Sequence, residues 1–572
     1  RRRRRRSRQS AAREAGAPVV AFRFEVSAFP IKVTTIFGDE KKAVGIAAKW
    51  IRAAAAASGR ADDVRESVAA WTLFNIYPLL VLRTGKGGSE KQMNKRLGHA
   101  LVRFNRGEWK ELWEEAQARA SVERAKMAEK ASISAGNADP GTERTRKHKR
   151  AASLAKAGDM QAAVKALDPV PMAPRTLETF EELQRLNPPA EDDDFDLDAW
   201  TLKASTYKAD LDELELVHLV KATNGLKPAR AQDRFGWRSE FIFPLMNGEV
   251  VNDVFEIVKI FLRGDAPLAV YHTMAGSRAS AHLKPGRPGV RPIGITDVFR
   301  KVAGRVLAFA YRESLIKFFS AGRVHQFACG HSRGVQLCLT AIREHLRLHS
   351  DHVMIAEDDK NAFNEIYLSA VAEGLDALAT TLGAGHGRAM LCFFMSMYGL
   401  HESVDLTFFT ADGQRHVVKN RRGVTQGCVL GTILYCIATH HIINETLNND
   451  ETRDVHAYSI ADDTNLVGPF AQVATAAKTI QVAKRTRAGL RARKIEVLRG
   501  AHAPPVTRQI LIDLGVGDEN TEFDIQSDGG MDVGETGGGD AGLNLLGGPV
   551  GSMAHARAFV RGVVSKHKPR LE

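Results

Sequence analysis

The spacing of apolar residues changes along the chain, and each spacing predicts a different kind of element. Residues 71–195 place apolar side chains at helical spacing, for example Leu97 and Phe104, and Gly107 separates two of the predicted helices. Residues 200–500 instead alternate short apolar runs, typical of strands, with longer helical patterns. The pattern therefore predicts an α+β domain that follows a mainly helical N-terminal region.

Composition adds information on segment boundaries, especially where apolar residues are few. Residues 1–70 are rich in Arg and Ala and predict a basic, disordered segment, whereas residues 71–195 predict a basic helical extension that ends in an acidic, proline-containing stretch. Residues 501–542 are acidic and rich in glycine, which predicts a flexible insertion, and order is expected to resume over 543–572. A domain boundary is therefore expected near residue 200.

Composition narrows the classes of partner and compartment. The 572 residues include 80 Lys and Arg against 67 Asp and Glu, a formal charge of +13, and 44% are hydrophobic. This balance favours a polyanionic partner, nucleic acid before membrane, although a basic surface can also serve solubility alone. The five cysteines include no C-x-x-C pair, which favours a reducing, intracellular compartment and argues against a disulfide framework or a zinc module.

The apolar runs of the chain and its first residues indicate whether it carries a membrane span or a secretory signal. No run of about 18 uncharged apolar residues occurs, so no membrane span is expected. The first residues, RRRRRRSRQSAAREAG, lack the apolar core of a secretory signal and do not begin with Met. We therefore expect a fragment, or a gene model interrupted at its start, with roughly two to four domains or subdomains.

Two clusters of carboxylates lie far apart in the sequence but have a similar local setting. Asp462 and Asp463 stand between two strand-like runs in YSIADDTNLVGP, which predicts a hairpin with both side chains at its tip. Asp358 and Asp359 end a predicted buried strand in DHVMIAEDDKNAFNEI. Neighbouring like charges repel, and a divalent cation would offset them. Either cluster alone is typical of a solvated turn, but together they suit two-metal phosphoryl transfer with Mg²⁺.

Two further stretches carry groups that suit a nucleotide. In RGVTQGCVLGTILY, glycines allow the backbone to approach a ligand closely, and Gln426 offers both donors and an acceptor. In KPGRPGVRPIGITDVFRKV, Lys284, Arg287 and Arg291 lie on a turn-rich element before a predicted helix. Cations so placed suit a triphosphate, and a solvated surface is the alternative.

Taken in order along the chain, six stretches resemble motifs of reverse transcriptases, most closely those of non-LTR retrotransposons. They are KPGRPGVRPIGITDVFRKV, EDDKNAFNEI, RGVTQGCVLGTILY, YSIADDTNLVGP, AGLRARKIEVL and LNLLGGPVGS, and the resemblance covers about residues 75–555. It implies a right-hand polymerase fold with fingers over 200–350 and a palm, built on an antiparallel sheet, over 351–500. It also implies a primer-grip element and the truncated start of a thumb over 543–572.

The resemblance implies a role for each residue that matches a motif. Asp358 and Asp462 would be the principal metal ligands, with Asp463 assisting. Phe363 would lie below the sugar and exclude a 2′-hydroxyl, and Lys494 would protonate the leaving pyrophosphate. The other residues implied to contact the nucleotide or template are Lys284, Arg291, Asp359 (through its backbone carbonyl), Gln426 and Gly427.

The activity implied by the resemblance is RNA-directed DNA polymerisation. The implied partners are an RNA template, a DNA primer and dNTPs, with Mg²⁺ as the cofactor and Mn²⁺ as a substitute. The implied location is intracellular, in the nucleus in preference to the cytoplasm. No membrane partner is expected, and the oligomeric state stays open.

Departures from the family pattern leave two alternatives open. Ile460 stands where the family has Tyr or Phe before Ala-Asp-Asp, and the sequence holds no full thumb, endonuclease or Cys/His finger. The chain could therefore be a truncated, catalytically inactive retroelement remnant that only binds RNA. The second alternative is a viral RNA-dependent RNA polymerase, against which Ala461 and the pair Gln426–Gly427 argue.

Overall fold

The structure is a computed structural model, and it describes most of the chain between residues 64 and 525. The described residues are 64–82, 90–134, 140–156, 160–167, 169–189, 195–206, 214–227, 231–246, 250–284, 288–382, 386–401, 403–525, 542–545, 548–551, 557–558 and 560–561. The predicted basic segment over 1–70 therefore lies outside the described residues as far as residue 63.

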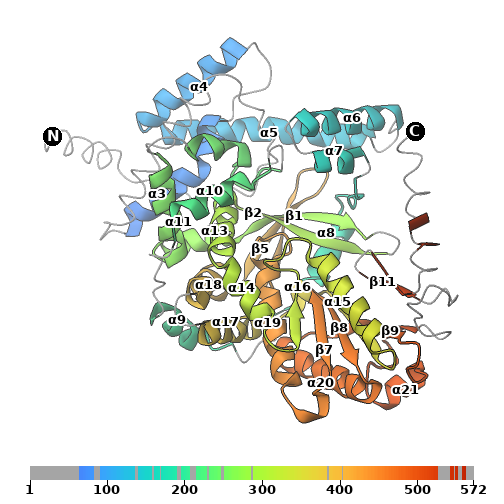
Figure 1. Ribbon diagram of the computed structural model, residues 1–572. Helices are drawn as coiled ribbons and strands as arrows, with labels where there is room; N and C mark the ends of the chain where they lie inside the picture. Colours follow the sequence, from blue (N-terminus) through green and yellow to red (C-terminus); the bar gives the residue numbers. More distant parts are fainter. Residues whose placement is uncertain are drawn as a thin grey trace.

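The N-terminal part is helical, as predicted. Its elements are α3 (Val64–Tyr77), the π-helix η3 (Pro78–Leu82), α4 (Glu90–Asn105), α5 (Trp109–Ser134), α6 (Pro140–Lys156) and α7 (Met160–Leu167). Gly107, between α4 and α5, has a φ of 83°, which glycine adopts without strain. Figure 1 shows α5 and α6 running along one side of the molecule, across from the helices and sheets that follow.

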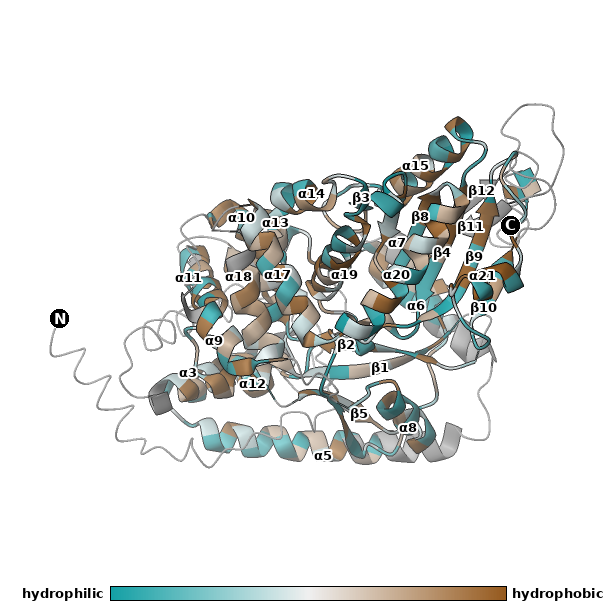
Figure 2. Cartoon of the chain, turned by 90° about the horizontal axis from the view of Figure 1, so that it is seen from below, coloured by the Kyte–Doolittle hydropathy of each residue, from teal (hydrophilic) through white to brown (hydrophobic). Residues whose placement is uncertain are grey.

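One stripe of α4 and α5 is buried. Leu97 and Phe104 of α4 and Leu112 and Trp113 of α5 are buried, and the Phe104 ring meets that of Tyr77 edge-on at 5.1 Å. Hydrophilic and hydrophobic residues alternate along α5 in Figure 2. Helical spacing therefore places the apolar residues against the core and leaves the charged residues of these helices toward solvent.

The chain after α7 adds a second group of helices, several of which pack around the largest buried core. They are α8 (Leu177–Arg185), α9 (Leu197–Thr206), α10 (Leu216–Asn224), α11 (Val250–Arg263), α12 (Leu268–Ala275), α13 (Val298–Ala310), α14 (Arg312–Phe319), α15 (Gly334–Leu348), α16 (Ala362–Glu365), α17 (Leu368–Leu382), α18 (His386–Phe394), α19 (Gly431–Leu447), α20 (Phe470–Ala488) and α21 (Arg508–Asp513). Short turns of other helix types are η5 (Ser239–Phe241), η6 (Phe243–Met246), η7 (Met395–Gly399) and η8 (Asp450–Thr452). Across the described part of the chain, no helix combines the length and apolar character needed to cross a bilayer.

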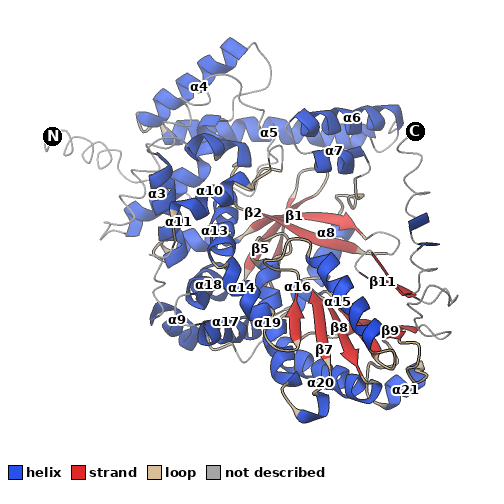
Figure 3. Cartoon of the chain, viewed as in Figure 1, coloured by secondary structure: helices blue, strands red, loops and turns tan. Residues whose placement is uncertain are grey.

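The strands form two larger sheets and one small hairpin (Figure 3). The four-stranded sheet has the order β2-β1-β5-β6, and the six-stranded sheet has the order β10-β9-β4-β8-β7-β3. The strands are β1 (Ser277–Leu283), β2 (Val290–Thr296), β3 (Val324–Gln326), β4 (Val353–Asp359), β5 (Val404–Phe409), β6 (Arg415–Asn420), β7 (His456–Ile460), β8 (Asp463–Gly468), β9 (Ala492–Arg499) and β10 (Glu522–Ile525). β11 (Gly542–Leu545) pairs with β12 (Gly548–Gly551).

The six-stranded sheet carries both carboxylate clusters and is mixed, which corrects the prediction of an antiparallel sheet. β9, β4, β8 and β7 run antiparallel to one another in turn, but β10 joins β9 and β3 joins β7 in parallel. Parallel neighbours need a long connection, and both edge strands have one: α21 lies between β9 and β10, and several helices separate β3 from β7. The α+β class is confirmed, whereas the division into fingers and palm stays a prediction.

The two faces of the six-stranded sheet are covered by different helices. Ile355 of β4 shares a buried cluster with Ile480 of α20, whereas Met354 and Ala356 share another cluster with Ile342 of α15. Because side chains alternate along a strand, odd-numbered positions of β4 face α20 and even-numbered positions face α15. The alternation decides where the acidic residues at the end of this strand point.

Residues 501–525 differ from the flexible insertion predicted over 501–542. They contain α21 and β10, and Leu511 and Val516 are fully buried in one cluster with Ile495 of β9. The apolar residues of this stretch are few, but they lie where the sheet edge can bury them. The rest of the predicted insertion, residues 526–541, lies outside the described residues.

Candidate active site

The end of β4 and the β7–β8 hairpin bring three carboxylates together. Asp358 of β4 lies directly opposite Asp463 of β8 in the antiparallel register, so their side chains leave the same face of the sheet. Asp462 and Ala461 form the turn between β7 and β8. Ala461 has a φ of 53°, an unusual conformation for a residue with a side chain, and it turns the chain sharply enough to keep Asp462 at the tip.

The electrostatic coupling of these residues agrees with that geometry. The pKa of Asp463 is raised to about 7, mainly by burial and then by the charges of Asp462 and Asp358. Burial is also the main cause that raises the pKa of Asp462, to which Asp358 adds, while the nearby Arg291 acts in the opposite direction. Like charges held together in a partly buried position favour binding of a cation, since a cation relieves their repulsion.

The carboxylates do not form a closed metal cage. Among the residues that the structure describes, no group of three or more His, Cys, Asp or Glu side chains is placed so that together they could hold a metal ion. Mg²⁺ does not require such a cage, because it commonly takes one or two carboxylates and completes its octahedral shell with water and phosphate oxygens. An open site at the strand ends, with two facing carboxylates and a third at the turn, therefore fits Mg²⁺ better than it fits zinc.

Arg493 pairs with Asp358, a contact that the sequence analysis did not predict. The guanidinium donates to Asp358 Oδ2 and also reaches Glu522 of β10 at 3.3 Å. The register of β4 against β9 shifts between Asp358 and Asp359, which brings the arginine beside the carboxylate. The adjoining cations in AGLRARKIEVL were a signal, but the bulge that selects Arg493 is a property of strand pairing.

Lys494 lies opposite Asp358 in the same register but uses its ammonium group elsewhere. Its Nζ donates to Glu496 Oε1 at 2.6 Å and to Asp524 Oδ2 at 3.3 Å. Burial lowers the pKa of Lys494, but the two carboxylates more than offset that effect and hold it above its usual value. The predicted role of Lys494 as a proton donor therefore requires it to leave these partners.

Asp359 points away from the carboxylate cluster. Its side chain is buried on the α20 face of the sheet, where its Oδ2 accepts hydrogen bonds from Tyr435 at 2.8 Å and from Lys484 at 3.1 Å. Its predicted role involved only the backbone carbonyl and is not affected by this orientation. Phe363 follows in α16, where its ring lies 5.0 Å from that of Tyr435 and its carbonyl accepts from the Val424 amide at 2.7 Å.

The glycine-rich loop docks on the strand that carries Arg291. The Gln426 carbonyl accepts a hydrogen bond from the Gly294 amide of β2 at 2.7 Å. Gly427 has a φ of 104°, and a Cβ built on it would lie 2.5 Å from the Gly294 carbonyl oxygen, so no other residue fits there. Gln426, Gly427 and Arg291 therefore occupy one corner of the molecule, and Arg291 is exposed and electrostatically close to Asp462.

Lys284 is a predicted site residue that lies at the β1–β2 connection. It follows β1, and its amide donates to the Gly289 carbonyl at 3.1 Å to close the β1–β2 connection. Its charge lowers the pKa of Glu182 on α8 by a small amount, after Arg185. Arg287 lies outside the described residues.

Comparison with known proteins indicates a distant relationship. No protein-family model matches the chain. Over 205 residues the chain is 25% identical to a protein of Trypanosoma brucei gambiense named retrotransposable element SLACS 132 kDa protein. The match covers 36% of this chain and 16% of that protein, a small part of the relative's length. The chain is therefore similar to a retroelement protein over about a third of its residues.

Proposed function

We propose that the chain is an RNA-directed DNA polymerase of a retroelement, of the kind that non-LTR retrotransposons encode. The observation that carries the proposal is the convergence of Asp358, Asp462 and Asp463 at the ends of the central strands of the six-stranded sheet. These residues come from segments far apart in the sequence, and gathering their charges is unfavourable unless positive charge offsets them, as Arg493 does in part and bound cations would do further. The similarity to a retrotransposable element protein supports the retroelement origin.

The residues around the cluster suit nucleotide transfer. The carboxylates fit Mg²⁺, or Mn²⁺ in its place, which would stabilise charge on the reacting phosphate of a dNTP as a primer 3′-hydroxyl attacks it. Arg291, exposed beside Asp462, neutralises phosphate charge, and Gly427 allows the loop backbone to approach the base pair. Phe363 lies below the sugar and excludes a 2′-hydroxyl.

In this proposal the domains are those of a right-hand polymerase. Residues 200–350 form the fingers, residues 351–500 form the palm, and residues 543–572 begin with the primer grip. The basic chain binds an RNA template mainly through its phosphate backbone, so its affinity falls steeply as salt is raised. A nuclear location follows from the proposed role in copying a retroelement.

Primer extension tests the proposal directly. Purified protein is incubated with a DNA primer annealed to an RNA template, the four dNTPs and Mg²⁺, and the primer is expected to lengthen. A chelator added in excess should stop the reaction, and Mn²⁺ should restore it. Absence of extension with either metal, from protein that is folded and binds the primed RNA, would contradict the proposal.

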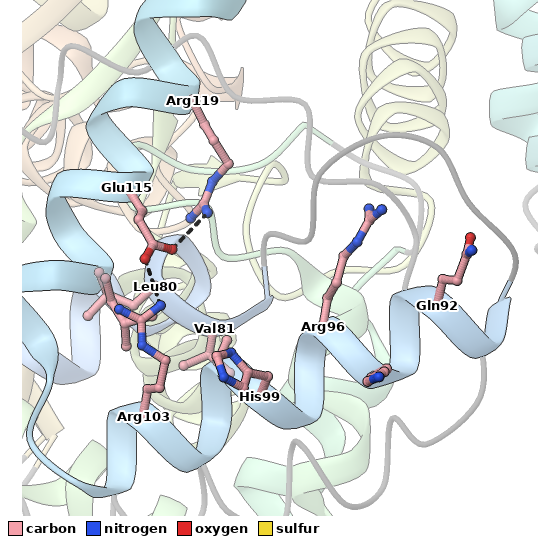
Figure 4. Close-up of a pocket in the computed structure, with 11 residues that line it drawn as sticks. Leu80, Val81, Gln92, Arg96, His99, Arg103, Glu115 and Arg119 are labelled. Carbon is pink, nitrogen blue, oxygen red and sulfur yellow. Dashed lines mark hydrogen bonds and ion pairs between the residues drawn. The ribbon is translucent and has the colours of Figure 1, made fainter.

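An RNA-binding remnant without catalysis is the second candidate, and a basic crevice near the N-terminal end supports binding by itself. The crevice lies between α4 and α5 above η3 and has a volume of about 430 Å³ (Figure 4). The side chains that line it are Leu80, Val81, Gln92, Lys95, Arg96, His99, Ala100, Arg103, Leu112, Glu115 and Arg119. Glu115 is bound by Arg103 at 2.7 Å and by Arg119 at 3.6 Å, so cations outnumber the single carboxylate.

Charge reversal in this crevice is expected to weaken RNA binding. The variant Lys95→Glu/Arg96→Glu changes two exposed cations of α4 and should lower the affinity for single-stranded RNA by about tenfold at moderate salt. The slope of log affinity against log salt concentration should become shallower, by the equivalent of about one to two phosphate contacts. Fluorescence anisotropy across a salt series measures both quantities. The matched control is Lys110→Glu/Lys126→Glu on α5, which makes the same charge change outside the crevice. Equal losses in the two variants would show that only net charge matters.

A further inference from the structure

A set of polar side chains is buried on the α20 face of the sheet, behind the carboxylate cluster. Glu357 and Asp359 flank Asp358 on β4 and face the opposite side. Lys484 of α20 lies between them, and its side chain is 2% exposed, against 0% for Glu357 and 1% for Asp359. A charge so deeply buried must be paired to be tolerated, so the three side chains constrain one another.

The contacts of Lys484 join two strands of the candidate site, β4 and β8. Its Nζ lies 3.1 Å from Asp359 Oδ2 and 3.7 Å from Glu357 Oε2, and it donates to the hydroxyl of Thr464 on β8 at 3.4 Å. Thr464 directly follows Asp463 in the sequence. The lysine therefore ties the end of β4 to the start of β8 at the positions adjacent to the facing carboxylates.

The same buried pair holds the side chain of Tyr435 on α19. The tyrosine is fully buried, and its hydroxyl donates to Asp359 Oδ2, the oxygen that Lys484 also contacts. Burial raises the pKa of Tyr435 well above its usual value, and the charge of Asp359 adds to the effect, so the hydroxyl keeps its proton and remains a donor. One end of the ring is thereby fixed.

The ring of Tyr435 in turn limits where Phe363 can lie. The two ring centroids are 5.0 Å apart with an interplanar angle of 36°. The backbone of Phe363 is held from the other direction, because its carbonyl accepts from Val424 and a Cβ on Gly423 would lie 2.5 Å from that carbonyl oxygen. With its backbone and one ring face both in contact, Phe363 has little freedom to change rotamer.

We propose that Tyr435, held by the buried Asp359–Lys484 pair, is a positioning residue that fixes the ring of Phe363 and thereby sets the preference for deoxyribose over ribose. This inference rests on the proposed polymerase function. Tyr435 does not touch the nucleotide; it acts through Phe363. The choice of sugar then depends on a polar unit on the far side of the sheet from the carboxylate cluster.

Four proteins test this role: Tyr435→Leu, Tyr435→Phe, Phe363→Ala and the double variant Tyr435→Leu/Phe363→Ala. The measured quantity is the ratio of kcat/KM for a dNTP to that for the matching rNTP. Tyr435→Leu should lower the ratio by roughly tenfold through a gain in rNTP use, with dNTP turnover changed only a few-fold. Tyr435→Phe, which keeps the ring but loses the hydroxyl, should fall between this variant and the unmodified chain.

The double variant separates positioning from a general structural effect. If Tyr435 acts through Phe363, the double variant should have the same sugar preference as Phe363→Ala alone, because the second change has nothing left to disturb. A further loss of preference in the double variant would overturn the proposal. An unchanged ratio in both Tyr435→Leu and Tyr435→Phe would also overturn it.

A spectroscopic readout keeps the inference testable if the chain proves inactive. With 4-fluorophenylalanine at position 363, the fluorine resonance should shift or broaden in Tyr435→Leu. It should stay unchanged in Tyr458→Leu, which makes the same change on the α15 face of the sheet. Absence of nucleotide incorporation by the unmodified chain would contradict the proposed function, whereas an unperturbed fluorine resonance in Tyr435→Leu would contradict the positioning role.

Discussion

Asparagine at position 462 is expected to abolish primer extension while the protein stays folded and still binds RNA. Asp462 lies in the β7–β8 turn, next to the facing pair Asp358 and Asp463. An amide has nearly the shape of the carboxylate but not its charge, so a metal ion loses a ligand and its electrostatic attraction. Metal stabilisation of the transferring phosphate supplies several kcal/mol, so the rate should fall by about a thousandfold or more.

The stability of this variant should not fall. Burial and the neighbouring charge of Asp358 raise the pKa of Asp462, which means that the folded protein holds this carboxylate at a cost. The amide removes that cost, so the thermal midpoint should be unchanged or slightly higher. Extension rates, circular dichroism and RNA filter binding give the three measurements.

The matched control is Asp450→Asn, which makes the same chemical change at an exposed position in η8. It should extend primers like the unmodified chain. If Asp462→Asn and the unmodified chain are equally active, the carboxylate cluster is not the site of chemistry. If neither protein is active but both bind RNA, the remnant that only binds RNA becomes the better proposal.

Among the variants proposed here, Lys484→Met is expected to cause the largest loss in the free energy of unfolding. The ammonium is the buried cation between Glu357 and Asp359, and its removal leaves two carboxylates without their counter-charge. Breaking a buried ion pair by removing one partner costs about 3–5 kcal/mol. The free energy of unfolding from urea titration should fall by that amount, with little change in the dependence on denaturant.

Two comparisons show whether buried charge is the cause. Lys478→Met makes the same change on an exposed turn of α20 and should cost little. The triple variant Lys484→Met/Glu357→Leu/Asp359→Leu removes all three charges and should recover part of the lost stability, because apolar side chains replace a buried ionic group well while the Tyr435 hydroxyl loses its acceptor. A triple variant less stable than Lys484→Met alone would mean that packing, not charge, dominates.

Local sequence patterns determined the elements and the residues at their ends. A short continuous apolar run predicted the buried strand that ends at Asp358, and the flanking strand-like runs predicted the hairpin with Asp462 at its tip. Helical spacing likewise predicted the helices around Leu97 and Phe104. These features depend on residues within a few positions of each other, so a single sequence is enough to predict them.

Local sequence patterns did not predict which distant strands pair with each other. The sheet is mixed because β3 and β10 pair in parallel with β7 and β9. Residues 501–525 are structured because the edge of the sheet buries Leu511 and Val516. Composition averaged over the acidic, glycine-rich segment could not reveal this packing.

The presence of carboxylates at the end of β4 and in the β7–β8 turn can be predicted from the sequence, because short-range periodicity specifies strands and turns. The partner of each charge depends instead on how distant strands and helices pack. A shift in the pairing of β4 with β9 brings Arg493 to Asp358, and alternation across the sheet turns Asp359 toward Lys484 and Tyr435. Packing of α15 and α20 on the two sides of the sheet determines the register between the strands. It also determines which face of the sheet each side chain takes.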